Sequence, residues 1–264
     1  MFTSLEQDSG QAPGPGSGTG PETGHGLRNQ VAEAARVLAR LGLVTAFGHV
    51  SARACGAMLI TPAADLASVT ADLVVEVPLG TREGLLPAGT PAEAWAHLAL
   101  YQARPDAAAI ARAQPPGAFA AAAAVSVMVP LHGQAAWLGE SVPVYDDATL
   151  LRSAEQAGRA ARCLPGGEAL LLRGNGALTL GATPGLAVAR MWLLAAACDV
   201  YLKALAASGA NPVTALSAGE IASWRAVSGE LLPRLWEHLR RRPGAGQTPS
   251  GLRPSEADAG EVEG

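Results

Sequence analysis

Hydrophobic positions along the chain alternate between helical and strand spacing, which is typical of an α/β domain. The clearest helix covers residues 27–41, carries its apolar residues on one face and ends at Gly42. Further helices are expected over residues 91–104, 117–125 and 150–163, and from residue 184 to at least residue 202. Strands are expected over residues 49–53, 57–61, 73–77, 107–111, 127–130, 141–145, 169–173 and 177–181.

Three local signals fix the boundaries of these elements. Thr90 and Glu93 have the spacing of a capping box, which predicts a helix that starts at Pro91. The turn of residues 174–176, Gly-Asn-Gly, predicts a hairpin, because these residues tolerate positive φ. Thr183 followed by a proline predicts the start of the long helix. Together the elements predict a single α/β domain whose mixed sheet is covered by helices on both faces.

The two ends of the chain differ in composition from the part between them. Residues 1–26 and 243–264 are rich in Gly, Pro, Ser and Thr and poor in apolar side chains, so both are expected to be disordered tails around a domain of residues 27–242. The first tail lacks the apolar core of a secretory signal. Residues 217–242 are apolar enough to pack on a neighbouring subunit.

Composition narrows the range of partners. Of the 264 residues, 49% are hydrophobic and only 4% aromatic, so a core of Ala, Val and Leu with close packing is expected. The net charge of −4 gives no electrostatic footprint for nucleic acid. The apolar stretches at 117–131 and 186–202 are too short or too interrupted by charge to span a membrane. Three scattered cysteines argue against a disulfide framework and favour a cytoplasmic location.

Several motifs, in this order and spacing, resemble the class II aldolase/adducin family over roughly residues 27–207. The motifs are FGHVSAR (47–53), LITP (59–62), PAEAWAHLALYQARPDAAAIARAQP (91–115), SVPVYDD (141–147) and LLLRGNGALTLG (170–181). The resemblance implies a single domain with a mixed, mostly antiparallel sheet between two layers of helices. It also implies a homotetramer with a small-molecule site between subunits.

The chain departs from the family at the metal ligands. Aldolases of the family bind zinc through two histidines of a His-x-His-Pro segment and one histidine of an Asn-His-Gly hairpin. The matching positions here are Arg112, Gln114 and Asn175. A guanidinium offers no lone pair, and neutral amide oxygens are poor zinc ligands, so we expect neither zinc nor another cofactor. An alternative metal site built from His49, His97 or His132 with Glu93 stays open.

A second departure concerns phosphate. The family's sugar-phosphate aldolases hold the substrate phosphate with a Gly-Asn loop, a Thr-Gly turn and a Ser-Ser pair. Here the matching positions read Gly48-His49, Ala63-Ala64 and Pro91-Ala92. Each hydrogen bond lost to a charged group removes roughly 1.5–3 kcal/mol, so a phosphorylated sugar is disfavoured.

Glu93 and Arg112 are the candidate catalytic residues. Glu93 stands at the position of the family's acid/base carboxylate, although it could simply complete the capping box of Thr90. Arg112 places a positive charge where the metal would lie and could stabilise a carboxylate or enolate. Alternatively, it forms a structural ion pair with Glu93.

The candidate substrate-binding residues are His49, Ser51, Gln114, Gln134 and Asn175. His49 has an ordinary pKa of about 6.5 and could orient or protonate a substrate, or bond local backbone. His97 follows Glu93 by one helical turn and could hydrogen-bond it. Asn175 is expected to be a turn residue first and a substrate contact second.

Two functions follow from these residues. One is a metal-independent carbon–carbon lyase, decarboxylase or isomerase that acts on a small unphosphorylated carbonyl or carboxylate compound. The other is a non-catalytic assembly module that resembles the head of adducin. An enzyme needs an open polar cleft around Glu93, Arg112 and His49, whereas an assembly module can have these side chains locked together.

Overall fold

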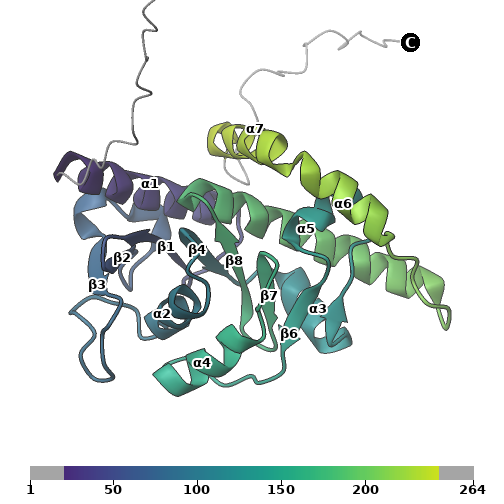
Figure 1. Ribbon diagram of the computed structural model, residues 1–264, viewed down its shortest axis with the longest axis horizontal. Coiled ribbons are helices and arrows are strands. Elements are labelled where there is room, and N and C mark those ends of the chain that lie inside the picture. Colours follow the sequence, from purple (N-terminus) through teal and green to yellow (C-terminus); the bar gives the residue numbers. More distant parts are fainter. Residues whose placement is uncertain (1–20, 244–264) are drawn as a thin grey trace, which may run out of the picture.

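The computed structural model describes residues 21–243, which form one mixed sheet between two layers of helices (Figure 1). The strands are β1 (His49–Ala54), β2 (Ala57–Ile60), β3 (Val75–Pro78), β4 (Ala109–Ala113), β5 (Val127–Met128), β6 (Val142–Tyr145), β7 (Ala169–Leu172) and β8 (Gly176–Gly181). Their order across the sheet is β3-β2-β1-β4-β8-β7-β6-β5, and only the pair β6 and β7 is parallel. The predicted fold class is confirmed.

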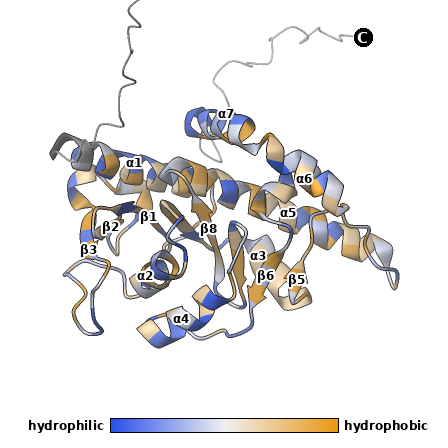
Figure 2. Ribbon diagram, in the orientation of Figure 1, coloured by the Kyte–Doolittle hydropathy of each residue, from blue (hydrophilic) through white to orange (hydrophobic). Residues whose placement is uncertain are grey.

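The helices occupy both faces of this sheet. They are α1 (Pro21–Arg40), α2 (Ala94–Ala103), α3 (Pro116–Ala124), α4 (Ala154–Arg162), α5 (Pro184–Ser208), α6 (Ala218–Ala226) and α7 (Ser228–Arg241), with 3₁₀ turns η1 (Leu66–Ser68), η2 (Ala71–Leu73) and η3 (Gly133–Leu138). One face is covered by α1, α3 and α5, and the opposite face by α2 and α4. The hydropathy colouring shows apolar strands between helices of mixed character (Figure 2).

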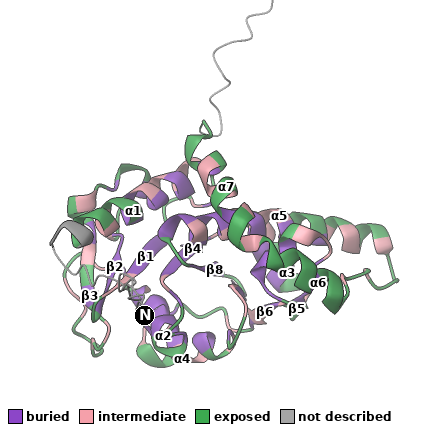
Figure 3. Ribbon diagram, turned by 45° about the horizontal axis from the view of Figure 1, so that its top comes forward, coloured by how far each residue is buried: buried purple, intermediate pink, exposed green. Residues whose placement is uncertain are grey.

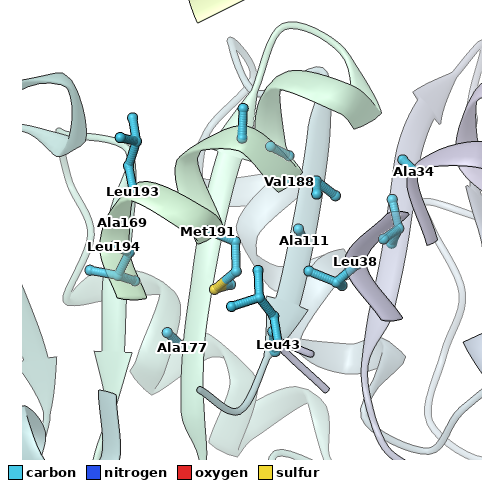
Figure 4. Packing of buried hydrophobic residues seen from close by; sticks show 14 of the residues in the cluster. Ala34, Leu38, Leu43, Ala111, Ala169, Ala177, Val188, Met191, Leu193 and Leu194 are labelled. Atoms are coloured by element: carbon cyan, nitrogen blue, oxygen red, sulfur yellow. The ribbon is translucent and has the colours of Figure 1, made fainter. Parts of the chain in front are cut away.

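Alanines in the strands let the helices approach closely. Ala111 of β4 and Ala177 of β8 are fully buried under Leu38 of α1 and Met191 of α5 (Figure 4). Helix α5 is long and apolar enough to cross a membrane, but it packs on β4, β8, α1 and α3. Its composition therefore reflects its position in the core, where small side chains give the close packing expected from the composition.

Several predicted boundaries are wrong. The helix predicted from residue 150 starts at Ala154, after its N-cap Ser153, and the strand predicted from residue 73 starts at Val75. Residues 21–26, predicted as part of a disordered tail, begin α1, while residues 1–20 and 244–264 lie outside the described residues. Strand β4 starts two residues later than predicted, because the backbone N–H of Ala107 still bonds Arg104 in a turn. The second helix starts at Ala94 rather than Pro91. The Thr90 hydroxyl has no hydrogen-bond partner, so the predicted capping box does not form.

The C-terminal segment packs on the same subunit. Leu232 and Leu239 of α7 are buried, and Trp236 lies against Gly185 of α5. Trp224 of α6 contacts the ring of Trp137 in η3. The apolar residues of this segment, which were expected to contact a neighbouring subunit, thus pack largely against the core of the same chain. The outer surfaces of α6 and α7 are exposed (Figure 3). The homotetramer stays a prediction.

Candidate functional site

The topology gathers the candidate residues at one edge of the sheet. Strand β1 runs antiparallel to both β2 and β4, so the start of β1 lies beside the end of each. His49 at the start of β1 pairs in register with Arg112 near the end of β4. The next strand, β8, starts beside Ala113 and brings the Gly174–Gly176 turn to the same edge. Glu93 reaches this edge from the N-terminus of α2.

Arg112 lies at the centre of a buried polar cluster. Its side chain is only 2% exposed. The Nη2 group donates to Glu93 Oε1 at 3.3 Å and to Asn175 Oδ1 at 2.5 Å. With the Gln114 amide turned so that its oxygen faces Arg112, Nη1 donates to that oxygen at 2.5 Å, and the amide nitrogen donates to the backbone oxygen of Phe47. Burial lowers the pKa of Arg112 while Glu93 opposes this shift, and a guanidinium remains charged at neutral pH.

Asn175 forms hydrogen bonds with both Glu93 and Arg112. Its Nδ2 donates to Glu93 Oε1 at 3.3 Å, while its Oδ1 accepts from Arg112. Its position between Gly174 (φ 67°) and Gly176 (φ 83°) in the hairpin turn aims the side chain at both partners. The three positions where the family carries zinc ligands are therefore hydrogen-bonded together around the guanidinium.

These side chains do not fit a zinc ion. Arg112 brings a fixed positive charge and no lone pair, and it already engages the oxygens of Gln114 and Asn175. Among residues 21–243, no three His, Cys, Asp or Glu side chains come close enough to share a metal ion. His97, a member of the alternative metal site considered above, has its Nδ1 occupied by Ser51. A metal-free site stays a prediction.

A cavity of about 450 Å³ opens beside this cluster, within the range of roughly 300–1,000 Å³ common for small-molecule sites. It is lined by residues 46–49, 62–65 and 91–93 and by Arg152, and is called the Glu93 cavity below. Glu93 and His49 line it directly. Arg112 does not line it but contacts Glu93.

The lining includes the three segments that stand at the positions of the phosphate-binding segments of sugar-phosphate aldolases. Of their side chains, only His49 is polar. The backbone N–H groups of Ala63 and Ala64 are also occupied, by the carbonyls of Gly89 and Pro62. These three segments thus offer few donors to a phosphate dianion, and Arg152 is the cationic side chain in the lining.

The remaining candidate residues, Ser51, Gln114 and Gln134, lie in three different parts of the structure. Ser51 is fully buried and does not line the cavity; its Oγ lies 2.7 Å from His97 Nδ1 and 2.8 Å from the Tyr101 hydroxyl. Gln114 belongs to the Arg112 cluster. Gln134 is exposed on η3, which packs on α5 and α6, and it does not line the Glu93 cavity.

The two histidines of this region are neutral. Burial, together with the positive charge of Arg112, holds the pKa of His49 well below its ordinary value and lowers the pKa of His97 to about 3. His49 is therefore a poor proton donor at neutral pH, which corrects the expectation that it could protonate a substrate. His97 bonds Ser51 and not Glu93, because its ring lies inside the core on the α2 side of the sheet.

This burial predicts acid sensitivity. The pKa of His97 is lower in the folded chain than its value of about 6.5 in the unfolded chain, so protonation favours unfolding. The free energy of unfolding is therefore highest above about pH 6.5 and decreases as the pH falls towards 3. Between pH 7 and pH 5 the loss from His97 alone is about 2 kcal/mol. Urea unfolding at these two pH values should show a smaller difference for His97→Gln than for the wild type. The exposed His238→Gln serves as control, and an unchanged difference in His97→Gln would contradict the prediction.

Of the lining residues, only His49 and Glu93 were predicted as site residues, and the two largest side chains that were missed are Phe47 and Arg152. Phe47 stands directly before Gly48 and His49, so its place in that loop was the available signal. Arg152 lies 59 positions after Glu93 and shows no sequence pattern that links it to the cavity. Arg152 lies two residues before α4, which packs on α2.

Comparisons with known proteins agree with this fold. The family described as Class II Aldolase and Adducin N-terminal domain matches residues 29–202. L-fuculose-1-phosphate aldolase from Thermus thermophilus superposes with a TM-score of 0.62 at 29% identity, over 70% of this chain and 98% of that one. An aldolase II superfamily protein from Pseudomonas syringae gives a TM-score of 0.69 at 22% identity, over 85% and 94% of the two chains, and supports the fold alone.

One curated relative is similar in sequence over part of its length. It is a protein from Streptomyces roseochromogenus subsp. oscitans, named 4-hydroxy-3-prenylphenylpyruvate oxygenase/4-hydroxy-3-prenylbenzoate synthase, and is 36% identical over 120 residues. The aligned region covers 45% of this chain and 43% of the relative. The match of the family to most of the described domain is the broader result, and on that basis the chain belongs to the class II aldolase and adducin N-terminal domain family.

Proposed function

We propose that this chain is a metal-independent enzyme of the lyase type that acts on a small unphosphorylated carbonyl or carboxylate compound. The observation that carries the proposal is the contact of Glu93 with both the cavity and Arg112. The carboxylate can exchange a proton with a molecule in the cavity, and the guanidinium behind it supplies positive charge without a metal. Membership of an aldolase family and the enzyme names of its relatives support catalysis.

The proposed chemistry uses the charge balance of this pair. Glu93 takes the proton of a hydroxyl group, the adjacent carbon–carbon bond breaks, and its electron pair moves to the carbonyl as an enolate. Once Glu93 is protonated, the charge of Arg112 is no longer neutralised and can stabilise the enolate oxygen. Glu93 then returns the proton to carbon. The same two residues would serve a decarboxylase or an isomerase, since each passes through an enolate.

The test measures proton exchange at carbon. The protein, pretreated with a metal chelator, is incubated in D₂O with pyruvate, phenylpyruvate or 4-hydroxyphenylpyruvate, and deuterium uptake beside the carbonyl is followed by NMR. The phenylpyruvates are included because the Streptomyces relative is named for a compound of this type. Glu93→Gln is expected to lower the enzyme-dependent rate by roughly 10²–10⁴-fold, and the exposed Glu140→Gln to leave it unchanged.

Two results would contradict the proposal. Stoichiometric zinc or iron in the protein as purified would overturn metal independence. Exchange no faster than in protein-free buffer with all three compounds would favour the second candidate, an assembly module that resembles the head of adducin. The locked arrangement of Arg112 with Glu93, Asn175 and Gln114 is the observation that favours this second candidate.

A further inference from the structure

The Glu93 cavity has an uneven distribution of charge. Of the described residues that line it, four carry polar side chains: His49, Asp65, Glu93 and Arg152. The others are alanines, prolines, one glycine and Phe47. A ligand would therefore meet mainly apolar walls, and a few polar groups would determine how it is held.

Three of the four polar groups are already engaged or uncharged. Glu93 is neutralised by Arg112. Asp65 caps η1, where its Oδ1 accepts from the backbone N–H of Ala67 at 3.0 Å. His49 is neutral because of its burial and the charge of Arg112.

Arg152 differs from the other three. Within residues 21–243 its guanidinium makes no hydrogen bond and no ion pair, and it is exposed. Its backbone is fixed in position, because its N–H donates to Gln156 Oε1 at 3.2 Å and to the carbonyl oxygen of Leu150 at 2.9 Å. An arginine with a fixed backbone and an unengaged guanidinium is suited to bidentate binding of a carboxylate.

Phe47 supplies an apolar surface beside this charge. It is 70% exposed although it lines the cavity, and its backbone oxygen accepts from the Gln114 amide. A flat ring placed against it would remove apolar area from water at roughly 25 cal/mol per Å² and could add an aromatic contact.

We propose that Arg152 and Phe47 are the specificity-determining residues of this cavity, and that they select a carboxylate attached to an aromatic ring. Arg152 binds the carboxylate and Phe47 packs against the ring, in the same cavity that Glu93 lines. This inference rests on the proposed function only in treating the Glu93 cavity as the substrate site. It narrows the substrate class to aromatic acids.

The test is a binding experiment without turnover. Calorimetric titration uses phenylacetate, the neutral and nearly isosteric phenylacetamide, and acetate. Arg152→Ala is expected to weaken phenylacetate binding by roughly 10-fold or more, the equivalent of losing a hydrogen bond to a charged group, and to leave phenylacetamide unaffected. Arg152→Lys should recover part of the loss. Phe47→Ala should weaken both aromatic probes to a similar degree.

The control is Arg162→Ala, which removes an exposed arginine from α4 away from the cavity. The proposal is overturned if the wild type binds phenylacetamide as tightly as phenylacetate, if it binds neither, or if Arg152→Ala and Arg162→Ala behave alike. Binding that depends on Arg152 without any proton exchange would keep this inference and reject the proposed reaction. Proton exchange that Arg152→Ala leaves unchanged would keep the proposed reaction and reject this inference.

Discussion

Arg112→Leu is expected to lower the free energy of unfolding by about 3–5 kcal/mol, because it leaves a partly buried carboxylate without its cation. The Glu93 side chain is 13% exposed, so water replaces the lost charge only in part. Asn175 Oδ1 and Gln114 Oε1 also lose their donor, and neither gains another in the core. Leucine fills part of the volume that Arg112 vacates, so the loss reflects charge and hydrogen bonds more than an empty space.

A double-mutant cycle separates this pair from its surroundings. Glu93→Gln should be costly in the wild type, where it leaves Arg112 uncompensated, and close to neutral or stabilising in the Arg112→Leu background. The matched control is Arg173→Leu, because Arg173 pairs with Asp146 on the surface with side-chain exposures of 46% and 82%. An exposed pair of this kind contributes under about 1 kcal/mol. Urea unfolding followed by tryptophan fluorescence gives all four values, and equal costs for Arg112→Leu and Arg173→Leu would refute the argument.

The sequence predicted the sheet and its helices well because their signals are local. The Gly-Asn-Gly turn forms the β7–β8 hairpin, and the Thr183 hydroxyl caps α5 as expected. The capping box at Thr90 failed for a reason that lies far away in the sequence. The carboxylate of Glu93 bonds Arg112 and Asn175, which are 19 and 82 positions distant, and is not available to the helix terminus.

The site residues that belong to the family motifs could be predicted from the sequence. Those whose location depends only on tertiary packing could not. The motifs located Glu93, Arg112 and Asn175, which do meet, and the ion pair was one of two alternatives for Arg112. They gave no means of knowing that Ser51 and His97 face the core. Helical spacing places His97 on the same face as Glu93, yet the ring bonds Ser51 of β1. Arg152 lines the cavity from the segment just before α4, which packs on α2, and no local sequence pattern indicates this long-range arrangement.

Gly176→Ala tests whether the hairpin turn supports the Arg112 cluster. Gly176 has φ 83°, and a Cβ there would overlap the backbone oxygen of Ala113 and lie 2.9 Å from the Cα of Gln114. The left-handed conformation alone costs an alanine roughly 1–2 kcal/mol. Because the clash is with backbone, β4 or β8 must also shift, and we expect a total loss of about 3 kcal/mol or more.

The control for Gly176→Ala isolates the backbone clash from the conformational cost. Gly56, in the turn between β1 and β2, has φ 67°, and a Cβ there would meet no atom within 4 Å. Gly56→Ala therefore has the conformational cost alone, about 1–2 kcal/mol. Since the shift would move Gln114, whose amide bonds the backbone oxygen of Phe47, Gly176→Ala should also weaken phenylacetate binding, whereas Gly56→Ala should not. Urea unfolding and calorimetry measure the two effects. Equal losses of stability in the two variants would show that the Ala113 contact relaxes freely and that the hairpin does not hold the cluster in place.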